Sequence, residues 1–81
     1  MTRAFYALTR QQQVAFRNAV GAARDGDGME RAAFRTLDID RATVERTHTH
    51  GLHALVTERL ALTPEADRNL VEPVLFGGPT S

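Results

Sequence analysis

Cysteine, lysine and tryptophan are absent from this chain of 81 residues, and aromatic residues make up only 6% of it. Without cysteine, a small chain has neither disulfides nor thiolate metal ligands to stabilise it. No stretch approaches the roughly 18 apolar residues needed to cross a bilayer, and the first residues lack the pattern of a targeting signal. These absences favour a reducing compartment, so we expect a cytoplasmic protein with no membrane association.

The motifs of catalysis are missing as well. The sequence contains no Gly-rich phosphate loop, nucleophile elbow or Ser/His/Asp grouping, and its length leaves little room for a two-layer enzyme. We therefore expect a non-enzyme without catalytic residues or cofactors. Its 42% hydrophobic and 25% charged composition fits one globular domain, which we place at residues 1–76, with a flexible, Gly- and Pro-rich tail at residues 77–81.

Positive charge is concentrated at the start of the chain, although the net charge is zero. Residues 1–24 carry four arginines and no acid, whereas residues 25–59 and residues 60–81 each sum to −2. A zero net charge argues against a surface that is basic throughout. Any contact with nucleic acid must then come from a local basic region.

Two helices are predicted in the first half of the chain. Thr9 is a typical N-cap for the first helix, which the run Asp25-Gly26-Asp27-Gly28 should end. A second helix is expected from about Met29 to Leu37. The core-facing residues predicted by the 3.6-residue period are Phe16, Ala19, Val20 and Ala23 in the first helix and Ala33, Phe34 and Leu37 in the second. Arg10, Arg17 and Arg24 form a stripe beside the first of these faces.

A third helix is predicted after the interruption at Asp38-Ile39-Asp40. Asp40 is its expected N-cap, Val44 points inward, and Gly51 is the expected stop after His48 and His50 in the last turn.

Residues 52–62 fit two structures. Alternation across Leu52, Ala54 and Val56, followed by Leu60 and Leu62, favours a hairpin that turns at residues 57–59. Helical spacing of Val44, Leu52, Leu55, Val56 and Leu60 indicates instead a helix that runs through Gly51. We take the hairpin as the expected structure and keep the helix as the alternative.

A last short helix is predicted from Thr63-Pro64-Glu65 to about Val71, with Thr63 as N-cap and Pro64 at the first helical position. Pro73 and the glycines beyond it should prevent its continuation, although Val74, Leu75 and Phe76 are able to dock on the domain.

The segment from Ala33 to Val44 resembles the helix-turn-helix of prokaryotic transcription regulators. Leu37, Ile39 and Val44 match the apolar positions at which the two helices meet, and Asp38 stands where these proteins usually have glycine. Gly51-Leu52 and the string Leu60-Ala61-Leu62-Thr63-Pro64-Glu65 are similar to the end of the recognition helix and the closing helix of the winged type. The resemblance implies a mainly α winged helix-turn-helix with a small β-hairpin; an all-α bundle of three to four helices is the alternative.

The same resemblance implies a DNA-binding surface on residues 40–50, the expected recognition helix. Arg46 is the candidate for a bidentate contact to guanine, and Ala42 and Thr43 are candidates for base contacts. The full set of expected DNA-binding residues is Arg35, Arg41, Ala42, Thr43, Arg46, Thr49, His50 and Arg59.

The three histidines have the spacing H-x-H-x-x-H, which occurs in hydrolase metal sites. A catalytic metal centre needs further ligands that a chain with only three histidines lacks. We expect no metal, and we expect His48 and His50 to cap the end of a helix.

The first functional hypothesis is a small sequence-specific DNA-binding protein, a transcriptional regulator from a prokaryote or virus that binds double-stranded DNA as a homodimer. Its dimer surface is expected on the first helix or around Phe5, Tyr6, Val74, Leu75 and Phe76. The second hypothesis is a non-enzymatic protein-interaction module of the same fold, such as an adaptor or a phage-encoded protein, that does not read DNA.

Overall fold

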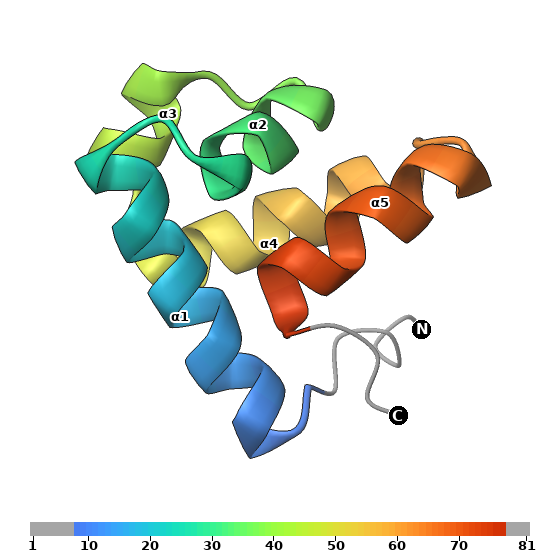
Figure 1. The fold of residues 1–81 in the computed structure, drawn as a ribbon, viewed down its shortest axis with the longest axis horizontal. Coiled ribbons are helices and arrows are strands. Elements are labelled where there is room, and N and C mark those ends of the chain that lie inside the picture. Colours follow the sequence, from blue (N-terminus) through green and yellow to red (C-terminus); the bar gives the residue numbers. More distant parts are fainter. Residues whose placement is uncertain (1–7, 78–81) are drawn as a thin grey trace.

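The computed structural model describes residues 8–77, and these residues form five helices with no strand between them (Figure 1). The helices are α1 (Arg10–Asp25), α2 (Met29–Thr36), α3 (Arg41–Arg46), α4 (Thr49–Leu60) and α5 (Glu65–Phe76). The winged-helix prediction is therefore wrong. The all-α alternative is the fold that forms, with more helices than the three to four expected.

The first two helices form as predicted. Thr9 and Gln12 make a capping box, in which the Thr9 hydroxyl accepts from the Gln12 N–H at 3.0 Å and the Gln12 side chain accepts from the Thr9 N–H at 2.9 Å. α1 ends at Asp25, and α2 follows after three residues. The predicted core residues of both helices are buried.

The turn between α2 and α3 matches its expected geometry. Asp38 has φ 64° and is the only described non-glycine residue with positive φ, as expected of the position where helix-turn-helix proteins usually have glycine. Asp40 caps α3 by accepting from the Thr43 N–H at 3.0 Å. Leu37, Ile39 and Val44 are at most 2% exposed, so the predicted meeting point of the two helices is part of the core.

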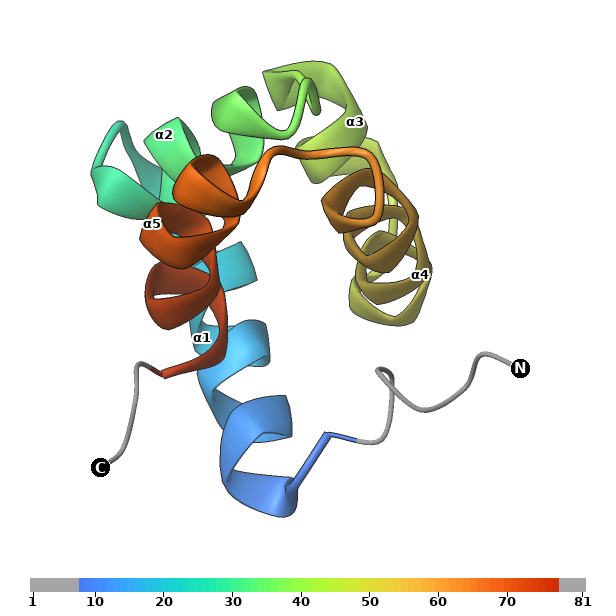
Figure 2. The same ribbon diagram turned by 90° about the vertical axis from the view of Figure 1, so that its right-hand side faces the viewer.

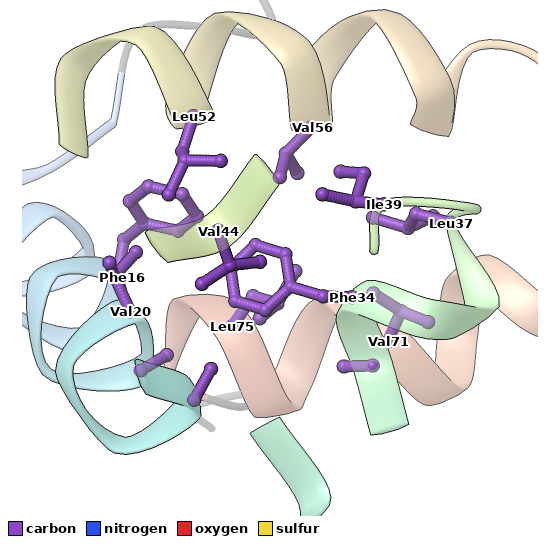
Figure 3. Packing of buried hydrophobic residues seen from close by; sticks show 13 residues of the cluster. Phe16, Val20, Phe34, Leu37, Ile39, Val44, Leu52, Val56, Val71 and Leu75 are labelled. Atoms are coloured by element: carbon purple, nitrogen blue, oxygen red, sulfur yellow. The ribbon is translucent and has the colours of Figure 1, made fainter. Parts of the chain in front are cut away.

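All five helices contribute to one core, which Figure 3 shows from close by. Phe34 lies at its centre, fully buried, with Phe16 packed edge-on at a ring-centroid distance of 6.3 Å. α4 contributes Leu52 and Val56, and α5 contributes Leu75, all three with no exposed surface.

The expected recognition helix over residues 40–50 is not continuous. α3 ends at Arg46, Thr47 adopts an extended backbone, and His48 begins a new helix. The guanidinium of Arg24 donates to the carbonyls of Val44 and Thr47 and thereby satisfies oxygen atoms that a continuing helix would have used. His48 is thus an N-cap, whose Nδ1 accepts from the Gly51 N–H at 3.1 Å, and it does not cap the end of a helix as predicted.

The expected hairpin over residues 52–62 is also a helix. Leu52 and Val56 lie four residues apart and face the core, whereas Ala54 between them is exposed, which is the pattern of a helix. Gly51 lies in the first turn of α4 and does not stop a helix. A side chain there would approach the Thr47 methyl group to 3.0 Å, so glycine permits the tight junction between α3 and α4.

α5 continues past the expected stop at Val71. Pro73 lies inside the helix, and Leu75 beyond it is fully buried. Gly77, with φ 93°, ends the helix and donates its N–H to the Pro73 carbonyl. Thr63 does not cap α5, because its hydroxyl donates to the Arg59 carbonyl.

The burial of Leu75 removes it from the expected dimer surface, and Phe5 and Tyr6 of that surface lie outside the described residues, as does most of the predicted tail. α1 and α5 pack against each other and against α2, and α4 lies across the core from α2 (Figures 1 and 3). Across residues 8–77, none of the helices has the length and apolar character that a membrane span requires.

Candidate functional site

The predicted DNA-binding residues do not form one surface. Arg35, Ala42, Arg46 and His50 are exposed, but they lie on three different helices. Arg35 is on α2 and lines neither of the two clefts described below. The break at Thr47 divides the rest between the outer surface of α3 and the first turn of α4.

Arg59, expected at the tip of a wing, is part of the scaffold. Its guanidinium donates to the carbonyls of Leu37 and Asp38 at 3.2 and 3.1 Å and approaches the Asp38 carboxylate at 3.5 Å. These contacts join α4 to the turn that precedes α3. Arg59 is therefore engaged with the protein's own backbone.

The surface of α3 is electrically balanced. Arg41 pairs with Glu45 across one helical turn at 3.0 Å. Asp40 accepts from the N–H of Thr43, and hydrogen bonding by Thr43 is the main cause that holds the pKa of this carboxyl below its ordinary value, with Arg46 adding a smaller electrostatic contribution. Among the described residues of this helix, Ala42 and Arg46 are exposed and make no side-chain hydrogen bond or ion pair.

Arginine has a second role that the sequence pattern does not reveal. Arg24, Arg31, Arg59 and Arg68 each donate to backbone carbonyls at or just beyond the end of a helix. Arg31 is only 5% exposed and donates to the Ala23 carbonyl near the end of α1 at 2.8 Å. A positive group at this place satisfies carbonyls that have no partner within the helix and complements the helix dipole.

A cleft of about 460 Å³ lies between α1 and α4. It is lined by Leu8, Gln13, Phe16, Arg17, Thr49, His50 and His53. No carboxylate is among these residues, so the polar part of the lining consists of cationic, titratable and neutral groups. We call this the basic cleft.

Further basic side chains border the basic cleft. Arg10 precedes Arg17 by seven residues and so lies on the same side of α1. His48 stacks on His50, with ring centroids 6.4 Å apart. Arg10, Arg17, His48 and His50 are exposed, and we refer to these four residues as the basic face.

The helix ends at the basic face lack the usual neutralising acids. The first turns of α1, α3 and α4 contain no acidic residue, whereas α2 has Glu30 and α5 has Glu65 and Asp67 in their first turns. Acids near a helix N-terminus are stabilising because they offset its positive end. The basic face thus combines the guanidinium groups of Arg10 and Arg17 with two helix starts that carry no acid in their first turns, and an anion bound there would be favoured by both.

His53 connects the basic cleft to the core. Its ring packs edge-on against Phe16 and Phe76, at centroid distances of 5.6 and 6.3 Å. Burial lowers the pKa of His53, and the neighbouring His50 lowers it further. His53 is therefore held neutral more strongly than an exposed histidine.

Within the described residues, no three His, Cys, Asp or Glu side chains are placed to hold a metal ion together.

The signal for the basic face was present in the sequence, since residues 1–24 and 46–57 contain no acid. It was not recognised as one surface because the two segments meet only in the folded chain. Comparisons with protein-family models, curated proteins and solved structures gave no match. The resemblance to helix-turn-helix regulators therefore stays a prediction, without the winged form that the structure of residues 8–77 contradicts.

Proposed function

We propose that the chain is a small DNA-binding protein that contacts the phosphate backbone through the basic face. The observation that carries this proposal is the basic cleft, where Arg17, His50 and His53 meet with no carboxylate in a protein of zero net charge. Phosphate contacts supply most of the affinity of such proteins. A local surface with basic side chains and no acid can make such contacts even though the net charge of the whole chain is zero.

Arg17 has the central place in this interface. It is exposed, it lies midway along α1, and it lines the basic cleft opposite Thr49 and His50. Thr49 and His50 belong to the first turn of α4, and a helix N-terminus favours a bound anion, although the Gly51 N–H of this turn is already taken by His48 Nδ1. Ala42 and Arg46 on the adjacent α3 are the members of the predicted set that we assign to base contacts.

Two copies of the basic face would multiply the affinity of a single small interface, so we propose that the protein binds DNA as a homodimer. The proposal keeps the hypothesis of a DNA-binding regulator but places its main contact surface on the basic face. A continuous recognition helix over residues 40–50 is no longer part of the proposal, which keeps only Ala42 and Arg46 of α3 as base contacts.

The test is fluorescence anisotropy with a labelled mixed-sequence duplex at about 50 and 200 mM salt. Affinity should fall about tenfold or more between these conditions because bound phosphates release counterions. Arg17→Ala should weaken binding severalfold and reduce the slope of log affinity against log salt by about 1. Arg35→Ala removes the same charge from an exposed site on α2 and serves as the matched control.

Absence of binding at the lower salt concentration would refute the proposal. Equal losses for Arg17→Ala and Arg35→Ala would also refute it, because they would show a response to net charge and not to the basic face.

A further inference from the structure

A second, larger cleft lies between α4 and α5. It has a volume of about 650 Å³ and is lined by Leu8, Gln12, Thr57, Leu60, Ala61, Arg68, Asn69, Glu72, Pro73 and Phe76. Figure 2 shows α4 and α5 on either side of the turn that connects them. We call this the apolar groove.

The walls of the apolar groove are hydrophobic but incompletely covered. Leu60, Pro73 and Phe76 are half-buried, and Ala61 is exposed. The core lies beneath them, since Leu60 and Phe76 pack against its buried residues. Concave surfaces of this kind, apolar inside and polar at the edge, are typical of binding sites.

Three exposed carboxylates lie on the two helices that form the apolar groove. Glu72 lines it directly, and Glu65, seven residues earlier, lies on the same side of α5. Glu58 lies one turn before Ala61 on α4 and is also exposed. These three acids place negative charge on both helices that form the groove.

Arg68 is the single basic residue of the lining, and it is directed to the protein's own backbone. Its guanidinium donates to the Thr63 carbonyl at 3.2 Å, in the turn between α4 and α5. The lining itself holds one acid, Glu72, and one base, Arg68, so the excess of negative charge comes from Glu58 and Glu65 on the same two helices, since Arg59 of α4 lies against Asp38. The charge is opposite to that of the basic face.

We propose that the apolar groove binds a short helical segment of a protein partner. This segment carries apolar residues on one face and arginine or lysine along the edges of that face. The apolar side of such a segment fits between Leu60 and Phe76, and its basic edges meet Glu58, Glu65 and Glu72. This is the helix-in-groove mode of recognition, with charge complementarity selecting the partner. The site is separate from the proposed DNA contacts, with which it shares only Leu8.

The experiment uses the full chain and a fluorescein-labelled peptide that carries leucines on one helical face and arginines along both edges of that face. We expect saturable binding that weakens as salt rises. Ala61→Arg fills the apolar groove with a side chain of the same charge as the peptide and should weaken binding about tenfold. Ala32→Arg, at an exposed alanine on α2, is the matched control and should leave binding unchanged.

A peptide with glutamate in place of arginine should bind at least several times more weakly, and circular dichroism should show both variants folded. The proposal is overturned if the arginine peptide does not saturate, if the glutamate peptide binds equally well, or if Ala61→Arg has no effect. Because Arg17→Ala should leave peptide binding unchanged, failure of the DNA proposal and failure of this one are distinguishable.

The sequence of residues 1–7 offers a competing occupant, since it contains Arg3, Phe5 and Tyr6. Tyr6 is the only tyrosine, and the chain has no tryptophan, so its fluorescence reports on this segment alone. We expect acrylamide to quench Tyr6 equally in the unchanged protein and in Ala61→Arg. If Tyr6 is shielded from acrylamide in the unchanged protein and loses this shielding in Ala61→Arg, the apolar groove is occupied by the chain's own segment. That result would overturn the partner proposal.

Discussion

The basic cleft and the apolar groove both reach Leu8 at the start of α1, yet their linings differ in kind. α4 contributes to both. Its first half gives Thr49, His50 and His53 to the basic cleft, and its second half gives Thr57, Leu60 and Ala61 to the apolar groove. The first acid of α4 is Glu58. A net charge of zero therefore conceals two neighbouring surfaces of opposite character, divided along one helix.

The two clefts are also supported by different forces. The α4 side of the basic cleft is positioned by polar contacts to the backbone, namely the bonds from Arg24 to the α3–α4 junction and the His48 cap. The α5 side of the apolar groove is positioned by packing, with Phe76 stacked on Phe16 and Leu75 fully buried. His53 joins the two, because it lines the basic cleft and packs against Phe76, whereas the contacts of Arg24 are confined to the α3–α4 junction.

The largest effect is expected where packing supports the apolar groove. Phe76→Ala removes a ring that stacks on Phe16 at 5.4 Å and contacts His53. We expect the free energy of unfolding to fall by about 2–3 kcal/mol, less than for a fully buried phenylalanine because Phe76 is half-buried. Urea denaturation measures this change. Leu70→Ala, at a 71% exposed position of the same helix, should change stability by less than about 0.5 kcal/mol.

A smaller effect is expected where polar contacts support the basic cleft. Arg24→Met keeps the length of the side chain but removes its hydrogen bonds to the carbonyls of Val44 and Thr47. The free energy of unfolding should fall by about 2 kcal/mol, since hydrogen bonds from a charged group are among the stronger ones. Arg17→Met, seven residues earlier on the same stripe and exposed, is the control. If both variants lose equal stability, the junction is not held by Arg24.

The helices that local signals define were predictable from the sequence. Thr9 and Asp40 are capping residues with a partner within three positions, and the Asp25–Gly28 run ends α1. Asp38 takes the left-handed conformation expected of a helix-turn-helix turn. Each of these features depends on neighbours in the chain, which a sequence pattern contains.

The region after Gly51 was not predictable in the same way. Leu52 and Val56 are four residues apart, and this spacing fits both one face of a strand and one face of a helix. The distinguishing residue is Ala54, which is apolar in sequence but exposed in the fold. Only the core formed by the other helices decides between strand and helix here. Local alternation therefore predicted a hairpin where α4 forms.

The candidate site was hidden for a related reason. Arg24 and Arg59 make their contacts with residues about twenty positions away, so no local pattern separates them from the exposed Arg17 and Arg35. The resemblance to DNA-binding proteins predicted the interface at residues 40–50. The acid-free surface forms instead where the first half of α1 meets the first half of α4.

The smallest expected effect is a pH dependence at the boundary of the two clefts. Burial lowers the pKa of His53 in the folded protein, so the unfolded chain binds a proton first as pH falls below about 6.5. Stability should therefore be highest above this pH and should decrease below it, until His53 also becomes protonated in the fold. The midpoint of urea denaturation at a series of pH values measures the decrease, and His53→Phe should reduce it. His50→Gln should retain most of it, because burial contributes more than the charge of His50. An unchanged pH profile in His53→Phe would mean that other groups produce the decrease.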